Sequence, residues 1–323
     1  MSCSCGPAME NLVNRGSDFF NDYADDEYGY QQNGTVNNQD DYSSDDEYQD
    51  DYSDEYSDDS DNGAYTTDEQ NYDDYESYDD YDESNNIVSY TLKNQTLSDP
   101  QYYDLKNDQY RSQQTDTALH QKLWLYATYV FPETYRKKID QVIFFSDGRD
   151  NDLAMVEPVN EDVNTKWVLY IDIVDGTDTV EYTHTLVHEL GHLITLSSDQ
   201  INASDYSCDY DSEFGCFTQS SYLNVFIDKF WMDILSEWQD IEYNTTTQED
   251  FDNQIMDFYD QYSDEFVSDY APTSPEEDFC ESWMYYVFKM QPDGGNIAKQ
   301  KMKFFDNYPE LTLLAKQIRT NLQ

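Results

Sequence analysis

The chain has 323 residues and a formal net charge of -52, from 69 acidic against 17 basic residues. Such acidity would repel the phosphates of nucleic acids and of anionic lipids, so we expect neither as a direct partner. No stretch of the sequence has the length and apolarity of a membrane-spanning helix.

The first 86 residues form an acidic, low-complexity segment. They carry about half of the net charge, contain Arg15 as their one basic residue, and repeat Asp, Tyr and Ser with almost no Leu, Ile or Val. This composition buries too little apolar surface to offset the entropy lost on folding. We therefore expect residues 1–86 to be a disordered arm and residues 87–323 to be the folded domain. The many tyrosines of the arm could bind a protein partner.

The N-terminal sequence and the cysteines bear on location. The start, MSCSCGPAMENLVNRGSDFF, has neither the basic nor the apolar region of a secretory signal. Five cysteines without a regular framework favour a reducing compartment, so we expect an intracellular protein. A bridge between Cys208 and Cys216 stays open for a protein that is exported by another route.

The first half of the domain is predicted to hold one helix and then a small sheet. Apolar residues recur at helical spacing over 115–130. Three short apolar runs are typical of strands: 141–146, 153–158 and 167–174. Asp178 and Glu181 form a capping box, which predicts that a helix begins there and continues to about residue 197.

The second half is predicted to be mostly helical. After a polar loop, residues 221–238 keep a strict i, i+3/i+4 apolar pattern, which predicts one amphipathic helix. Ser274 and Pro275 begin another. The helices expected in this part of the chain cover 249–264, 275–290, 296–306 and 309–321. A helix, a small sheet and then mostly helices indicate the α+β class.

The segment HTLVHELGH, residues 184–192, indicates a metal site. His188 and His192 lie four residues apart and therefore share one face of the helix, with Glu189 beside them. Two imidazoles and a carboxylate that takes a proton from a zinc-bound water make up the HExxH site. The alternative is a core helix whose histidines are merely hydrogen-bonded. We leave out His184, because a first-turn histidine of this kind is more often a structural residue.

A working zinc site needs a third ligand from elsewhere. The extended metzincin pattern is absent, since Thr195 and Ser198 stand where it needs Gly and His. The best candidate is Glu277, with Glu281 one turn later to accept the outer N–H of a ligating histidine. Glu277 could instead close a capping box with Ser274.

Other acids of this segment keep alternatives open. Glu276 and Asp278 could be first-turn acids that the helix dipole favours. Asp278 or Glu281 could also replace Glu277 as the third ligand.

HTLVHELGHLI and the later FVSDYAPTSPEEDFCESWMYYVF together resemble bacterial zinc metallopeptidases of the lethal-factor-like gluzincin type. The likeness covers roughly residues 120–290 and includes the helix SYLNVFIDKFW between the two motifs. It implies a zincin-like fold, in which a small mixed sheet packs on the HExxH helix. It also implies a Zn²⁺ ion held by His188, His192 and Glu277, with Glu189 as general base.

The same resemblance gives roles to other segments. Tyr270 matches the tyrosine that faces the metal, where it would assist at the oxyanion or the leaving amine. Cys280 replaces an alanine; it is expected to be a small buried thiol, although it could also bind metal. Residues 167–174 are expected to be the edge strand to which a substrate peptide adds, with Asp172 and Asp175 facing solvent.

Two functional hypotheses follow. The first is zinc-dependent hydrolysis of peptide bonds in a peptide or protein substrate, with Glu189 as general base. The second is a catalytically degenerate zincin-like domain that acts as a binding or structural protein through its acidic arm, although zinc binding alone has no need of Glu189. The arm could also inhibit the enzyme by lying in the active cleft. Substrate specificity and oligomeric state are not apparent from the sequence.

Overall fold

The computed structural model describes residues 85–148, 152–159, 166–202, 205, 207–208, 210–212 and 214–323. All of them belong to one unit of the chain. The arm predicted for residues 1–86 lies outside the described residues, except for Asn85 and Asn86. None of the described helices is long and apolar enough to cross a membrane.

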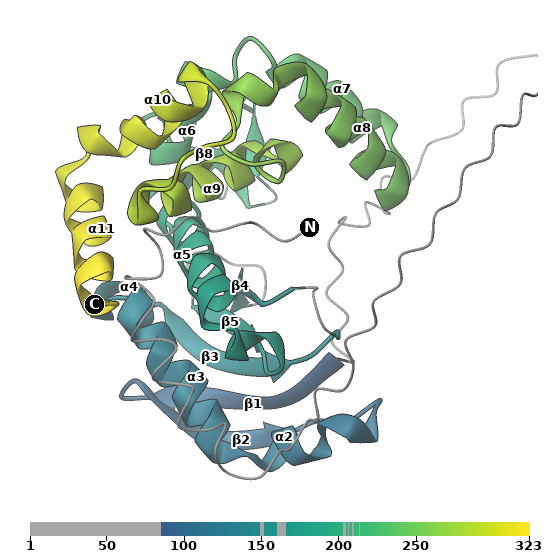
Figure 1. Ribbon diagram of the computed structural model, residues 1–323, viewed down its shortest axis with the longest axis vertical. Coiled ribbons are helices and arrows are strands. Elements are labelled where there is room, and N and C mark those ends of the chain that lie inside the picture. Colours follow the sequence, from purple (N-terminus) through teal and green to yellow (C-terminus); the bar gives the residue numbers. More distant parts are fainter. Residues whose placement is uncertain are drawn as a thin grey trace, which may run out of the picture. The chain divides into compact units, whose positions relative to one another are not determined.

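A five-stranded mixed sheet forms the N-terminal part of the fold (Figure 1). Its strands are β1 (Asn86–Lys93), β2 (Thr96–Tyr102), β3 (Ile139–Phe145), β4 (Ala154–Pro158) and β5 (Trp167–Asp172). They stand in the order β2-β1-β3-β5-β4. β3 and β5 run parallel, and the other neighbouring pairs are antiparallel.

The sheet begins with a hairpin for which the sequence pattern gave no clear signal. β1 and β2 pair across a turn at Asn94 and Gln95, which have positive φ angles of 51° and 66°. Two successive left-handed residues match the twist of a two-residue hairpin turn, and Asn is among the residues that tolerate this conformation. Asn-Gln is a weaker signal than Asn-Gly, so the hairpin was not apparent.

The predicted edge strand is wrong. β5 lies between β3 and β4, and all its residues are buried, as expected for an interior strand with a continuous apolar run. Within the described residues, β4 ends the sheet instead. Asp172 and Asp175 are buried rather than solvent-facing, with exposed fractions of 0% and 8%. Asp172 Oδ1 accepts the backbone N–H groups of Val174 and Asp175 at 2.6 and 2.8 Å, which shapes the turn before the next helix.

Helices make up most of the remainder, so the α+β class is confirmed. Those before residue 200 are α2 (Arg111–Thr115), α3 (Thr117–Val130), α4 (Glu133–Arg136) and α5 (Thr179–Thr195). Those after it are α6 (Tyr222–Phe230), α7 (Leu235–Asn244), α8 (Gln248–Tyr262), α9 (Pro275–Phe288), α10 (Asn296–Phe304) and α11 (Pro309–Asn321). A small sheet of β6 (Ile201–Asn202), β7 (Asp211–Ser212) and β8 (Gly215–Phe217) occupies the predicted polar loop.

The single amphipathic helix predicted for residues 221–238 is also wrong, because the chain turns between α6 and α7. Trp231 and Ile234, at the two ends of this turn, have φ angles of -111° and -121°. Both side chains are buried, so the apolar pattern continues through the break. The Trp231 indole N–H donates to Asp278 on α9 at 2.8 Å, a contact between distant segments that local spacing cannot reveal.

The helix that carries the histidine motif lies at the centre of this arrangement. α5 packs against β4 and α3 on one side and against α9 on the other (Figure 1). Thirteen of its 17 residues are buried, including His188 and Glu189. Such burial of polar side chains calls for partners on the neighbouring elements.

Candidate metal centre

α5 brings the two histidines of the HExxH motif together. The helix begins as predicted, with the Asp178 side chain accepting the N–H groups of Val180 and Glu181. One turn of helix separates His188 from His192, and their Nε2 atoms lie 3.3 Å apart. Two neutral imidazoles can share one proton at such a distance, but a pair of converging nitrogens is also the arrangement that a metal ion needs.

Glu277 completes a three-residue cluster. Ser274 caps α9, and its hydroxyl accepts the backbone N–H of Glu277 at 3.1 Å. The Glu277 side chain turns toward the histidines: its carboxylate oxygens lie 2.8 Å from His188 Nε2 and 3.3 Å from His192 Nε2. The capping motif is therefore present through the serine, while the glutamate side chain reaches the HExxH pair.

The second imidazole nitrogen of His188 has its own partner. His188 Nδ1 lies 2.9 Å from Glu281 Oε1, and the other oxygen of Glu281 accepts the Ser268 hydroxyl at 2.7 Å. A carboxylate on Nδ1 selects the tautomer that leaves Nε2 as a free lone pair. Glu281 thus contacts the His188 nitrogen that its predicted role requires, and the role itself stays a prediction.

The carboxylate and the two imidazoles of this cluster shift one another's pKa values. Burial works to raise the pKa of Glu277, but the two histidines outweigh it and hold that pKa well below its usual range. Burial likewise opposes a raised pKa at His188 and His192, yet the nearby Glu277 raises both. Glu277 is therefore an ionised, half-buried carboxylate, whose charge a protonated histidine or a metal ion can balance.

Glu189 lies on the same helix between the histidines and contacts the edge strand. Its Oε2 accepts the backbone N–H of Val156 on β4 at 2.9 Å. Burial raises the pKa of Glu189 to about 7. The carboxylate can consequently change its protonation state near neutral pH.

A metal ion fits the residues present. Ligand atoms bound tetrahedrally at about 2.0–2.1 Å lie about 3.3 Å from one another, close to the separations between His188, His192 and Glu277. One carboxylate oxygen, Glu277 Oε2, is buried and lies 2.8 Å from His188 Nε2, but within the described residues no donor meets it with good hydrogen-bond geometry. Each oxygen of the Glu277 carboxylate faces one imidazole nitrogen, which is an arrangement that a shared metal ion can bridge.

Cys280 lies at the cluster as well, so the metal-binding alternative that the sequence left open for it stays open. One ligand atom from each of His188, His192 and Cys280 lies within 4.8 Å of the other two, so this group could hold a metal ion. Burial, followed by the surrounding carboxylates, raises the pKa of the Cys280 thiol well above its ordinary value. Metals bind the thiolate, which favours the ionised Glu277 as the third ligand.

Tyr270 stands at the rim of the cluster. Its ring centroid lies 6.0 Å from that of His188, and 51% of the residue is exposed. It directly precedes the 3-10 turn Ala271–Thr273, which leads into Ser274 and α9. Tyr270 therefore lies beside His188 with its ring accessible from solvent, and its role facing a metal stays a prediction.

The two remaining histidines are structural. His184 is buried against Phe288, with ring centroids 4.9 Å apart, and burial lowers its pKa to about 4. His120 Nδ1 lies 2.7 Å from the Tyr90 hydroxyl, and its Nε2 lies 2.8 Å from the Gln113 carbonyl oxygen. Leaving His184 out of the site agrees with this placement.

The other acids of α9 have partners of their own. Asp278 Oδ2 lies 2.6 Å from Lys301 Nζ, and both side chains are fully buried. Glu276 accepts a hydrogen bond from the Tyr210 hydroxyl. Asp278 thus faces away from the histidine pair, and the proposal that it replaces Glu277 as a ligand is wrong. Neither partner was apparent from the sequence, because Lys301 and Tyr210 lie far from α9 along the chain.

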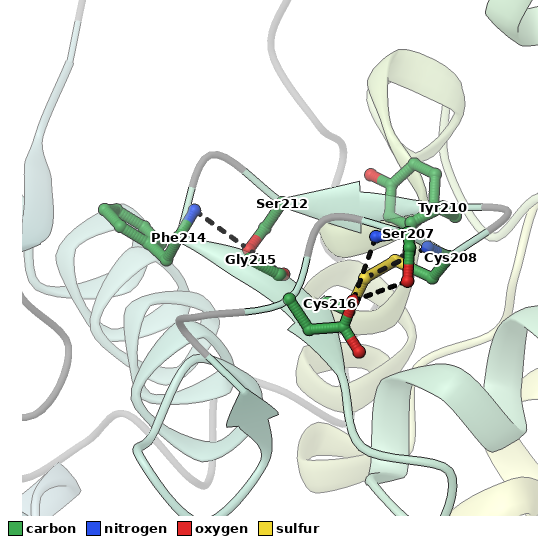
Figure 2. Close-up of a disulfide and its surroundings, with 8 residues drawn as sticks. Ser207, Cys208, Tyr210, Ser212, Phe214, Gly215 and Cys216 are labelled. Atoms are coloured by element: carbon green, nitrogen blue, oxygen red, sulfur yellow. Dashed lines mark hydrogen bonds between the residues drawn. A yellow bond between two sulfur atoms is a disulfide. The ribbon is translucent and has the colours of Figure 1, made fainter.

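A disulfide closes the loop that carries Tyr210. Cys208 and Cys216 are bonded, with Cα atoms 5.9 Å apart, and Tyr210 lies within the closed loop (Figure 2). The Tyr210 ring stacks on Phe217 at a centroid distance of 6.3 Å. The bridge that the sequence left open is present, so the cysteines lend no support to the expected reducing compartment.

Comparisons of the chain with known protein families, with curated proteins and with solved structures found no match. The resemblance to gluzincin peptidases stays a prediction.

Proposed function

We propose that this chain is a zinc metallopeptidase whose ion is held by His188, His192 and Glu277. The observation that carries the proposal is the convergence of these three side chains, whose nearest ligand atoms lie 2.8 to 3.3 Å apart. Two histidines and one glutamate are the donor set of one class of catalytic zinc sites, which keep a fourth position open.

Glu189 would be the general base. A zinc ion would lower the pKa of a water beside it and polarise the carbonyl oxygen of the scissile peptide bond. With a pKa of about 7, the Glu189 carboxylate can take up a proton near neutral pH and pass it to the leaving amine. The Val156 N–H holds one of its oxygens, which orients the other.

Tyr270 and β4 would serve the substrate. The exposed phenol of Tyr270 beside His188 can donate a hydrogen bond to the oxygen that gains charge in the transition state. β4 ends the sheet within the described residues and contacts Glu189 through Val156. An extended peptide pairing with β4 would place a peptide bond near the base.

The test compares metal content and activity in one pair of proteins. The full chain and Glu189→Gln are loaded with zinc, assayed for bound metal, and incubated with a diverse peptide library. We expect about one zinc per chain in both and a loss of cleavage of about 100-fold or more in the variant. Glu181→Gln, an exposed change on the same helix, serves as the matched control and should cleave normally.

Two outcomes would reject the peptidase. One equivalent of zinc without cleavage by the unchanged chain would favour the degenerate binding domain instead. Failure of the chain to bind zinc would reject both functions.

A further inference from the structure

The C-terminal helices carry a basic pocket in a strongly acidic chain. Residues 289–323 contain six of the 17 basic residues but only three of the 69 acidic ones. A cavity of about 460 Å³ lies among these helices. We call this cavity the basic pocket, because four basic residues line it: Lys289, Lys299, Lys303 and Arg319. Asp306 is the one acid among its lining residues.

The four cations have no anionic partners within the described residues. The ion pairs of the described part of the chain involve other side chains. Asp306 accepts a hydrogen bond from the Tyr286 hydroxyl at 2.9 Å. Arg319 Nη1 donates to the Val287 carbonyl at 2.8 Å, which orients the guanidinium and leaves its other N–H groups available. Unpaired cations held together in a chain with a surplus of acids favour an anionic ligand.

Lys289 occupies a position that suits glycine. It ends α9 in the left-handed conformation, with φ 57° and ψ 38°. A residue with a Cβ atom is destabilised there, and glycine is the usual choice at the end of a helix. A lysine at this point therefore supplies a charge to the pocket at some expense in backbone energy.

The pocket also has an apolar part. Met290, Pro292 and Met302 share its lining. Its volume lies within the range of ordinary ligand pockets. A ligand that matches it carries an apolar or aromatic group together with several negative charges.

The cations do not form a compact phosphate cradle. Lys289 follows α9, Lys299 and Lys303 lie on α10, and Arg319 lies near the end of α11. The lining residues of α10 and α11 stand beyond the first turn of each helix, so no helix N-terminus offers its backbone N–H groups. Charges spread over separate segments suit several carboxylates along an extended chain better than one phosphate.

We propose that the basic pocket binds an acidic peptide segment of a protein partner. Its carboxylates pair with Lys289, Lys299, Lys303 and Arg319, and an aromatic or apolar side chain between them contacts the methionines. Along α9, Lys289 lies twelve residues beyond Glu277, a distance of about 18 Å. The pocket is therefore separate from the metal centre, and the proposal does not depend on peptidase activity.

Fluorescence anisotropy tests the proposal with the full chain. The probe is a labelled peptide of Asp-Asp-Tyr-Ser repeats, with an Asn-Asn-Tyr-Ser peptide as the neutral control. We expect saturable binding of the acidic peptide that weakens as salt rises from about 50 mM to about 500 mM. Lys299→Gln and Lys303→Gln should each weaken it about two- to fivefold. Lys316→Gln, an exposed change outside the pocket on α11, should leave it unchanged.

Lys289→Gly separates binding from folding. Glycine relieves the left-handed backbone, so this variant should melt at the same or a higher temperature while it binds the acidic peptide more weakly. Equal binding of the neutral peptide, or equal loss in Lys316→Gln, would overturn the proposal. So would failure to bind the acidic peptide below about 1 mM, or its displacement by inorganic phosphate at about 10 mM, which would indicate a phosphate site.

Discussion

Gly191 on α5 and Cys280 on α9 are in direct contact. A Cβ atom at residue 191 would stand 2.8 Å from the Cys280 Sγ and 3.1 Å from its Cα, so a larger residue would force the helices apart. α5 carries His188 and His192, and α9 carries Glu277. The glycine therefore sets the helix separation at which the three side chains meet.

Gly191→Ala should destabilise the chain by about 1–3 kcal/mol and weaken zinc binding, because the new methyl group overpacks the contact. The direction of this change in stability tests the contact, because alanine normally stabilises a helix interior relative to glycine by about 0.5–1 kcal/mol. Urea unfolding and zinc titration measure the two effects. Adding Cys280→Gly, which removes two of the three contacting atoms, should recover part of both losses. A stabilised Gly191→Ala variant would contradict this account of the contact.

The identity of the third ligand can be tested by zinc titration against a chelating dye. Glu277→Gln should weaken zinc binding by more than about 100-fold, and Glu281→Gln by about 10- to 100-fold, because the first loses a ligand and the second only the support of His188. Cys280→Ala should bind zinc within about threefold of the unchanged chain. Loss of zinc in Cys280→Ala with retention in Glu277→Gln would assign the metal to the cysteine instead.

Asp172 should make stability depend on pH. Burial raises its pKa from 3.8 to about 7 in the folded chain, so the folded state holds this proton more tightly than the unfolded state. The stability that this proton contributes is fully present below about pH 4 and is lost as pH rises to about 7. Asp172→Asn keeps an oxygen for the N–H groups of Val174 and Asp175 but cannot ionise. As pH rises from about 4 to about 7, the free energy of unfolding of the variant, measured in urea, should increase relative to that of the unchanged chain by about 2–4 kcal/mol. If the free energies of unfolding of the two proteins changed in parallel with pH, Asp172 would not be the source of the pH dependence.

The Tyr210 hydroxyl should support the metal centre through Glu276, the neighbour of Glu277. Tyr210→Phe keeps the ring but leaves a half-buried carboxyl without its donor, so we expect a loss of stability of about 1–2 kcal/mol and weaker zinc binding. Reduction of the disulfide between Cys208 and Cys216 should act in the same direction, because it opens the loop that holds the tyrosine. Tyr262→Phe removes a hydroxyl that donates to Glu237 at 2.7 Å on the surface, and it is the matched control. Equal effects in the two tyrosine variants would argue against a specific role of Tyr210.

The helices that carry the site could be predicted because their signals are local. Asp178 begins α5 and Ser274 begins α9, each through hydrogen bonds to N–H groups two or three residues ahead. His188 and His192 share a helix face by spacing alone. The spacing of Glu277 and Glu281 made Glu277 a candidate ligand beside its capping alternative, and the resemblance added weight to it. No local pattern could join it to His192, because 85 residues separate the two.

Contacts between distant segments account for the failures. β5 is interior because β4 pairs with its outer side, and an apolar run does not reveal which neighbour lies at the edge. α6 ends before Trp231, whose indole bonds to Asp278, and Lys301 is buried because it pairs with that same carboxylate. In an acidic sequence, a buried lysine and a buried aspartate look like ordinary surface residues.

A crystal structure of the zinc-loaded chain, with anomalous scattering measured at the zinc edge, would locate the metal directly. We expect one strong peak about 2.0–2.2 Å from His188 Nε2, His192 Nε2 and a Glu277 oxygen, with Glu189 outside bonding distance. A peak bound to Cys280 and not to Glu277, or no peak between α5 and α9, would contradict the proposed metal centre.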